Sequence, residues 1–305
     1  MSNAKDIRAK IKSVKNTQKI TKAMEMVAAS KMRRAQDNMQ QGRSYAQNIL
    51  RVVNHMMASS KADFAETHYL LSEREEVRNV AYLLVTTDRG LCGGLNINLF
   101  KKLLDHMQEH QNQQRGVYFS VLGRKGIAFV NRMKGHIVHQ KENYGDSPLL
   151  DDIIDGMKVL QELFRLGKVD RVYVVSNHFT NTMTQTPFVL QVLPAGSVNE
   201  KEMSTISGGA SNHAEELPQH SWEYLYDAYR DVMLDGLITR YIESLVKQAV
   251  VENIACEMAA RMIAMKSASD NAGSLISDLQ LQYNKARQAA ITQELSEIVG
   301  GAAAV

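Results

Sequence analysis

Residues 232–299 decide the fold, and they read VMLDGLITRYIESLVKQAVVENIACEMAARMIAMKSASDNAGSLISDLQLQYNKARQAAITQELSEIV. No proline interrupts these 68 residues. At a rise of about 1.5 Å per residue, a helix of this length spans about 100 Å. Its apolar or small side chains recur at steps that alternate almost throughout between four and three, as in a coiled coil: Val251, Ala255, Met258, Met262, Met265, Ser269, Ala272, Ile276, Leu279, Tyr283, Ala286 and Ala290.

Residues 3–57 predict a second long helix. Asn3 can cap its start, and Asp6 suits a helix N-terminus. Its apolar stripe is narrow and shifts near Gln18 and Thr21, where the seam is polar. A long helix cannot bury such a stripe alone, so we expect the two helices to pack against each other. The predicted stripe contains Ile7, Ile11, Val14, Ile20, Met24, Val27, Ala35, Met39, Ala46, Ile49, Val53 and Met56.

The segment between these helices has a different period. Residues 80–85 form a continuous apolar run, as in a strand that is buried on both faces. We expect further strands at 117–122, 137–138, 172–175 and 184–193, with Pro187 confining the last one to an edge. Helices are expected around 99–107, at 127–133 and at 153–166. This alternation predicts a parallel-rich α/β domain over 78–194.

Two further segments follow the α/β domain. Residues 195–221 are rich in Gly, Ser and Asn and predict a flexible loop. Residues 222–305 begin with three aromatic side chains within five positions and continue into the C-terminal helix. Residues 1–57 complete the division as the N-terminal coiled-coil helix.

Composition restricts the class of protein. The chain has 305 residues, 44% of them hydrophobic, and a net charge of +3. Nothing is apolar enough to span a bilayer, and we expect no secretory signal. Two cysteines suit a reducing cytoplasm. The charge is uneven, because residues 1–57 hold twelve Lys and Arg against three Asp and Glu, a net +9 that leaves −6 for the remainder.

The turn Asp88-Arg89-Gly90-Leu91-Cys92-Gly93-Gly94 follows a strand and opens a helix, which is where α/β folds bind phosphates. Its glycine spacing matches neither common phosphate-binding motif, so a structural turn is the preferred interpretation. Cys92 could be an activated thiol at a helix N-terminus, although a small buried residue is favoured. A cytosolic enzyme with a phosphate site at 88–94 stays open as an alternative function.

Two other sites were considered. His106-Met107-Gln108-Glu109-His110 matches an inverted zinc-protease motif, but no third ligand is signalled and zinc is not expected. The basic N-terminal helix could bind duplex nucleic acid through charge alone. Its single aromatic residue, Tyr45, disfavours stacking on single strands. A basic coiled-coil protein that binds nucleic acid is therefore the second alternative.

Three stretches together resemble the γ-subunit family of bacterial F-type ATP synthases. They are KNTQKITKAMEMVAASKM at 15–32, the turn at 88–94 and NKARQAAITQEL at 284–295. The resemblance implies an antiparallel coiled coil of the terminal helices with a Rossmann-like α/β domain. It implies a central rotor that transmits torque between a membrane c-ring and a hexamer of α and β subunits, and so couples proton flow to ATP synthesis or hydrolysis. Members have no catalytic site, metal or cofactor of their own.

The resemblance also implies partners and contact residues. The expected partners are the α, β and ε subunits and the c-ring, with no nucleic acid and with membrane contact only through the complex. The expected location is peripheral, at the cytoplasmic face of the bacterial inner membrane. Contacts with the catalytic subunits fall, by motif position, on Met24, Arg261, Arg287, Gln288 and Thr292.

The resemblance also places the α/β domain at the membrane end of the rotor, called the foot, where it meets the c-ring and ε. The contacts expected there are Tyr224, Tyr226 and Asp227. Here the sequence departs from the family, because Asp227-Ala228-Tyr229-Arg230 stands where a Glu-Pro-Asp-Pro-like stretch is expected. The preceding loop is also longer than in the family. We expect this loop to be a local addition that touches ε.

Overall fold

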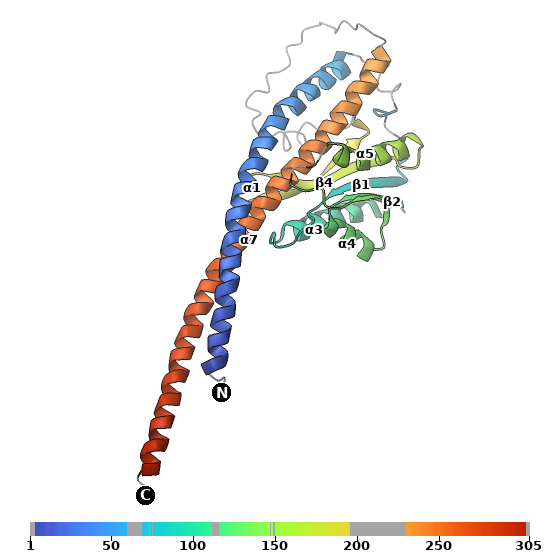
Figure 1. Cartoon of the computed structure of the whole chain (residues 1–305). Coiled ribbons are helices and arrows are strands. Elements are labelled where there is room, and N and C mark those ends of the chain that lie inside the picture. Colours follow the sequence, from blue (N-terminus) through green and yellow to red (C-terminus); the bar gives the residue numbers. More distant parts are fainter. Residues whose placement is uncertain are drawn as a thin grey trace. The chain divides into compact units, whose positions relative to one another are not determined.

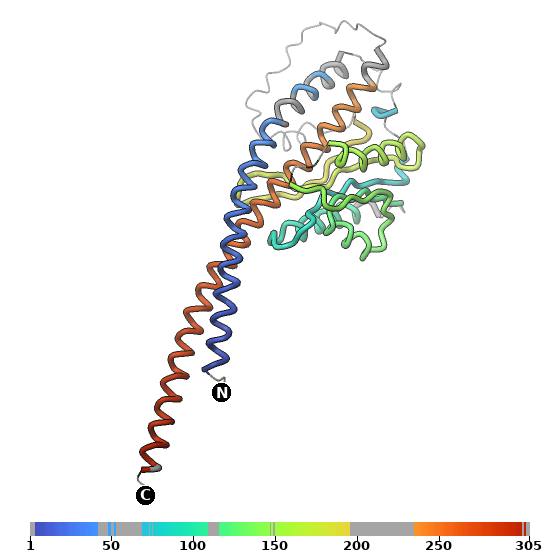
Figure 2. Tube along the Cα trace, viewed as in Figure 1, coloured from blue at the N-terminus to red at the C-terminus, as the bar shows by residue number. Residues whose placement is uncertain are grey.

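A computed structural model describes residues 4–59, 69–72, 74, 76–111, 116–146, 148, 150–195 and 230–302 (Figure 1), and Figure 2 traces the same chain with residues of uncertain placement in grey. The chain divides into two compact units. One, named the helical unit here, contains residues 1–29 and 261–305. The other, named the α/β unit, contains residues 30–260. Two long helices contribute to both: α1 (Ala4–Ser59) and α7 (Arg230–Ala302).

The α/β unit is built on a five-stranded sheet of order β3-β2-β1-β4-β5. Strands β1, β2, β3 and β4 are parallel to their neighbours, whereas β5 runs antiparallel to β4. The parallel-rich sheet expected from the sequence is confirmed, and Pro187 lies on the edge strand β5 as predicted. The strands are β1 (Asn79–Val85), β2 (Gly116–Leu122), β3 (His136–Lys141), β4 (Arg171–Phe179) and β5 (Gln185–Leu193).

Helices cover both faces of this sheet. Figure 1 shows α3 (Leu95–Gln111) and α4 (Arg124–Arg132) on one face and α5 (Leu150–Arg165) on the other. The first face buries Val80, Tyr82 and Leu84 of β1 against Leu99 and Leu103 of α3. All six residues from Val80 to Val85 are fully buried, so β1 is covered on both sides, as its continuous apolar run predicted.

Glycine lets α5 approach the sheet closely. A Cβ atom at Gly156 would stand 2.6 Å from Ser120 Oγ and 3.0 Å from His139 Nδ1. Gly123, just before α4, has φ +97°, and its Cβ would stand 2.3 Å from the carbonyl oxygen of Thr86. Both positions therefore exclude larger side chains, and they fix how α4 and α5 meet the strands.

Helix α1 ends two residues after its predicted end at 57, and α7 extends beyond both of its predicted bounds, 232 and 299. Helix α1 has 56 residues and α7 has 73. Neither of them, nor any other helix in the part of the chain that the structure describes, is long and apolar enough to cross a bilayer.

Within the helical unit, the start of α1 lies beside the earlier part of α7, the two run in opposite directions, and α7 then continues past α1 (Figure 1). Gln18 Nε2 donates a hydrogen bond to the carbonyl oxygen of Ser269 at 3.3 Å. The small side chains of Ala28 and Ala272 are buried, which permits close approach of the backbones. The antiparallel helix pair and the Rossmann-like domain together confirm the predicted fold class.

The α1 stripe is only partly as predicted. Ile7 is buried, but Ile20 is 60% exposed and Val27 is 55% exposed. The buried stripe instead passes through Thr21, whose hydroxyl donates to the carbonyl oxygen of Gln18 at 3.0 Å. The prediction that Ile20 and Val27 belong to the stripe was wrong, because Thr21 occupies the seam next to Ile20 and the small Ala28 occupies it next to Val27.

The α7 seam agrees better with its prediction. Met258, Met265, Ser269, Ala272 and Ile276 are all buried. Only the last predicted member, Ala290, is exposed. On α1, the predicted stripe residues Ala35 and Met39 are buried in the α/β unit. The side chains of Ala46, Val53 and Met56 lie outside the described residues.

Candidate functional site

The turn after β1 lies at the position where parallel sheets bind ligands. From β1 the chain adds β2 and β3 on one side of the sheet and then β4 and β5 on the other, so the topological switch point lies between β1 and β4. The turn follows the carboxyl end of β1. Here, however, protein groups bind one another. Thr86 Oγ1 donates to the carbonyl oxygen of Leu122 at 2.9 Å and accepts from the Gly126 N–H at 2.8 Å. The side chain of Asn96 donates to Thr87 Oγ1 at 2.8 Å.

The N-terminus of α4 already binds an anion from the chain itself. Asp88 Oδ1 accepts the backbone N–H groups of Arg124 and Asn143, each at 3.1 Å. Tyr144 is buried beside them and donates its hydroxyl proton to the carbonyl oxygen of Thr86. Burial raises the pKa of Tyr144 well above its ordinary value, and the carboxylates of Glu257 and Asp88 raise it further. The neutral phenol therefore closes this edge of the sheet. The geometry supports a structural turn, and gives no cradle to a phosphate.

Cys92 is a buried residue of the same turn. Its side chain is 3% exposed, and its sulfur accepts a hydrogen bond from Asn96 Nδ2 at 3.4 Å. Leu91 and Gly93 take positive φ values of 65° and 58° and turn the chain around it. The preferred interpretation of Cys92 as a small buried residue is confirmed.

His106 of α3 is half-buried and packs against aromatic side chains of the sheet. Its Nδ1 lies 3.0 Å from the hydroxyl of Tyr82, and its ring meets those of Tyr82 and Tyr173 edge-on. The side chains of Glu109 and His110 lie outside the described residues. Among the residues that the structure describes, no group of three or more His, Cys, Asp or Glu could hold a metal ion.

The helical unit presents a basic surface. Its formal net charge is +5, because residues 1–29 hold seven basic and two acidic residues while 261–305 hold four of each. Lys22 pairs with Glu25 at 3.0 Å. Six other exposed cations of α1 have no ion-pair partner among the described residues: Lys5, Arg8, Lys10, Lys12, Lys15 and Lys19. This surface is suited to an acidic macromolecule.

Exposed apolar residues accompany these charges. Met26 is 60% exposed on α1, near Ile20 and Val27 in sequence. On α7, Ile291, Leu295, Ile298 and Val299 are 47–68% exposed. They recur at steps of four, three and one, so they share one side of the helix. An exposed stripe of this kind beside basic residues is typical of an interaction surface rather than of a catalytic site.

The predicted contact residues differ in exposure. Arg287, Gln288 and Thr292 are exposed on the last part of α7, and Thr292 Oγ1 donates to the carbonyl oxygen of Gln288 at 2.9 Å. Met24 is half-buried, and Arg261 is only 8% exposed. Arg261 is therefore much less exposed to solvent than the other four residues. The predicted foot contacts Tyr224, Tyr226 and Asp227 lie outside the described residues, as does all of 196–221.

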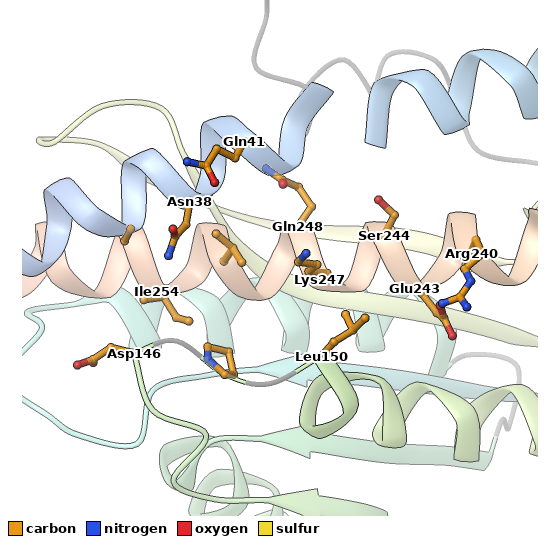
Figure 3. A pocket seen from close by; sticks show the side chains of 13 residues that line it. Asn38, Gln41, Asp146, Leu150, Arg240, Glu243, Ser244, Lys247, Gln248 and Ile254 are labelled. Carbon is orange, nitrogen blue, oxygen red and sulfur yellow. The ribbon is translucent and has the colours of Figure 1, made fainter. Parts of the chain in front are cut away.

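A cavity of about 360 Å³ lies in the α/β unit between α1, α7 and the segment before α5 (Figure 3). Its lining mixes charges, and several of these are paired: Arg240 binds Glu243 at 2.8 Å, and Asp146 binds Lys31. The lining is therefore of mixed charge and does not point to one ligand.

Sequence reasoning missed a buried polar contact between β4 and α7. Asn177 and His178 of β4 bind Asn253 and Glu252 of α7, and Ser176 binds the α7 backbone. The sequence does contain one indication that this part of α7 is buried. Residues 241–259 carry apolar side chains on every face, which is typical of a helix that is buried on all sides. The pairing itself joins residues more than 70 positions apart, and no local pattern reveals it.

Comparison with known proteins gives one family throughout the chain. The family model described as ATP synthase matches residues 3–305. A protein of Dichelobacter nodosus named ATP synthase gamma chain is 51% identical over 305 residues, covering all of both chains. A protein of a Psychrobacter species with the same name is 50% identical, again over all of both chains.

Solved structures show the same fold at low sequence identity. A chain in the cryo-EM structure of the Euglena gracilis mitochondrial ATP synthase, in its third rotational state, matches with a TM-score of 0.63 and 20% identity. The match covers 99% of this chain and 94% of that one. A chain from the rotor of the same enzyme matches with a TM-score of 0.61 and 19% identity over 94% and 98% of the two chains.

Proposed function

Because the chain belongs to the ATP synthase gamma chain family, we propose that it is the central rotor of an F-type ATP synthase. It transmits torque between a c-ring in the membrane and a catalytic hexamer of α and β subunits, and so couples proton flow to ATP synthesis or hydrolysis. Family membership agrees with the resemblance in the three motifs and disfavours both alternative functions.

The observation that carries the proposal is the helical unit. Two antiparallel helices share one seam, and α7 continues beyond its contacts with α1 into a stretch with exposed apolar side chains. Six exposed cations of α1 have no ion-pair partner within the part of the chain that the structure describes. Surface ion pairs are worth about 0–1 kcal/mol each. Weak charge contacts of this kind suit a shaft that must release one subunit and meet the next.

We further propose that the subunit is not itself catalytic and binds no cofactor. Support comes from the carboxyl edge of the sheet, where Asp88 takes the α4 N-terminus and Tyr144 closes the turn. A phosphate at this position would have to displace the Asp88 carboxylate from two backbone N–H groups. The alternative of a phosphate-binding enzyme therefore requires an anion site that the chain already fills.

The proposed contacts with the catalytic subunits are Met24, Arg261, Arg287, Gln288 and Thr292. The proposed foot contacts with the c-ring and ε are Tyr224, Tyr226 and Asp227. The proposed location is peripheral, at the cytoplasmic face of the bacterial inner membrane. We also propose the division into 1–57, 78–194, 195–221 and 222–305, with the segment 195–221 as an added loop that touches ε.

Reconstitution tests the function. Matching α and β subunits are assembled with and without this chain, and ATP hydrolysis is followed. Sustained turnover that requires the chain, at one copy per complex, is the expected result. If the chain neither joined the α and β subunits nor changed their turnover, the rotor function would be wrong. Tight binding of ATP or phosphate by the isolated chain would instead favour the enzyme alternative.

A further inference from the structure

Helix α7 meets the sheet through a buried polar contact, within the α/β unit. Ser176 Oγ donates to the carbonyl oxygen of Ala249 at 3.0 Å. Asn177 Nδ2 donates to Asn253 Oδ1 at 2.9 Å. His178 Nδ1 lies 2.8 Å from Glu252 Oε2. We name this set the β4–α7 joint, and its members are Ser176, Asn177, His178, Ala249, Glu252 and Asn253.

The register of the sheet explains why three consecutive strand residues reach one helix. The last pair that joins β1 to β4 is Leu84 with Val175, so β4 continues for four residues without β1 beside it. Helix α7 contacts β4 in this stretch, where Cys256 Sγ donates to the carbonyl oxygen of Asn177 at 3.5 Å. The helix therefore contacts both the side chains and the backbone of β4.

The joint is deeply buried. Ser176, Glu252 and Asn253 are 0% exposed, and His178 is 8% exposed. Glu252 also accepts a hydrogen bond from Gln248 Nε2 at 3.1 Å. Asn177 Oδ1 and Asn253 Nδ2 are the buried side-chain atoms left without a hydrogen bond among the described residues, and they are a complementary acceptor and donor.

Buried polar pairs fix register in a way that apolar packing does not. Leu, Val and Ala side chains can exchange neighbours when a helix slides or turns, at small cost. If α7 slid or rotated here, the His178 ring would lose Glu252 and Asn177 would lose Asn253, and these deeply buried polar groups would no longer meet across the contact, which is unfavourable. The joint therefore allows one position of α7 on the sheet.

We propose that the β4–α7 joint is the torque joint of this subunit, which prevents the α/β unit from slipping on α7 when the helix is twisted. The proposal rests on the proposed rotor function and adds the residues that hold the rotor together. Helix α7 continues without interruption from the joint into the helical unit, so a force applied to either part passes along one helix. His178 and Glu252 act as positioning residues.

The test uses the complete ATP synthase in inverted membrane vesicles. ATP hydrolysis and ATP-driven proton pumping are measured on the same preparation. In the main variant, His178→Leu and Glu252→Leu replace the pair together. An apolar pair of this kind is often neutral for stability, and losing the acceptor of Gln248 Nε2 weakens but does not abolish folding, so assembly is expected to survive. Hydrolysis should continue at the parent rate, while most of the pumping is lost because the helix slips under load.

Two further variants separate the joint from general stability. Glu252→Gln can still hydrogen-bond both His178 and Gln248, so it should pump like the parent. Ser176→Ala removes one weaker bond and should lose a smaller share of the pumping. The matched control is Glu162→Ala with Arg165→Ala, an exposed pair on α5 at 2.6 Å that should leave the ratio of pumping to hydrolysis unchanged.

The outcomes distinguish the joint from the rotor function. If the parent and the leucine variant both pumped normally, the proposed role of the joint would be wrong, and the rotor function would stand. A loss in Glu252→Gln as large as in the leucine pair would also overturn it, because hydrogen bonding would then not be what matters. A parent chain that supported no pumping would overturn the rotor function, and the joint with it.

Discussion

Asp170→Asn tests how the α/β unit is held together at the start of β1. Asp170 is 7% exposed. Its Oδ2 accepts the backbone N–H groups of Arg78 and Asn79, and its Oδ1 accepts Arg74 Nη1, all at 2.8 Å. Burial raises the pKa of Asp170, but the hydrogen bonds outweigh it and leave the pKa below its ordinary value. The carboxylate therefore stabilises the folded unit.

The expected loss of stability follows from the number of hydrogen-bond acceptors that the side chain offers. Asparagine has one oxygen, which can serve either the two backbone N–H groups or Arg74. In the cheaper arrangement the amide nitrogen faces the guanidinium of Arg74, and one charge-assisted hydrogen bond is lost. Such a bond is worth about 1.5–3 kcal/mol. We expect the free energy of unfolding of Asp170→Asn to fall by about 2 kcal/mol at neutral pH.

Urea unfolding followed by circular dichroism measures this change. A carboxyl group with a lowered folded pKa contributes stability above its unfolded pKa, about 3.9, and loses it as the pH falls through the folded pKa. The difference between parent and variant should therefore shrink in acid. The control is Glu76→Gln, whose carboxylate pairs with Arg78 at the surface and should cost under about 0.5 kcal/mol. A variant as stable as the parent, or a difference that persists in acid, would refute the role of Asp170.

Three other substitutions probe separate parts of the chain. Gly273→Ala should stabilise the isolated chain in thermal unfolding by up to about 1 kcal/mol, since its Cβ meets only the flexible end of Gln18, at 3.2 Å; a lower melting temperature would contradict this. Gly123→Ala should cost at least about 2 kcal/mol in urea unfolding, because its Cβ would stand 2.3 Å from the Thr86 carbonyl oxygen, and a parent-like midpoint would show that the turn can adjust. Met24→Lys adds a half-buried charge at the proposed contact with the catalytic subunits, so the number of protons pumped per ATP should fall; pumping at the parent ratio would place that contact elsewhere.

Much of the fold follows from local patterns in the sequence. The apolar run from Val80 to Val85 is a strand buried on both faces, and Pro187 lies on an edge strand, each for the reason that its residue type dictates. The proline-free ends form the two long helices. These features depend on neighbours in sequence, which a periodicity can capture.

The errors arise where polar residues replace apolar ones. The sequence analysis assigned Ile20 and Val27 to the stripe, although it also identified a polar seam near Gln18 and Thr21. The structure places Gln18 in the seam, where its amide binds the backbone of Ser269 at 3.3 Å, and Ile20 lies outside it. Such a bond depends on the partner helix, which no local pattern of α1 contains.

The candidate site also has features that the sequence predicted and features that it did not. The basic charge of α1 was visible in the sequence, and its exposed lysines lie on the helical unit. The contact between His178 and Glu252 was not visible, because it joins a strand to a helix 74 positions away. The proposed contact residues come from the motif resemblance. The structure shows that Arg261 is buried, whereas Arg287, Gln288 and Thr292 are exposed.

Rotation of this chain against the catalytic subunits can be observed under a microscope. Met183, 76% exposed in the turn between β4 and β5, offers a place for a single cysteine that carries a bead. The native thiols would not compete, since Cys92 and Cys256 are buried and burial raises the pKa of Cys256 well above its ordinary value. With α and β fixed to a surface and ATP supplied, the bead should turn continuously in one direction. A bead that stayed still on complexes that bind the chain and hydrolyse ATP would contradict the rotor function.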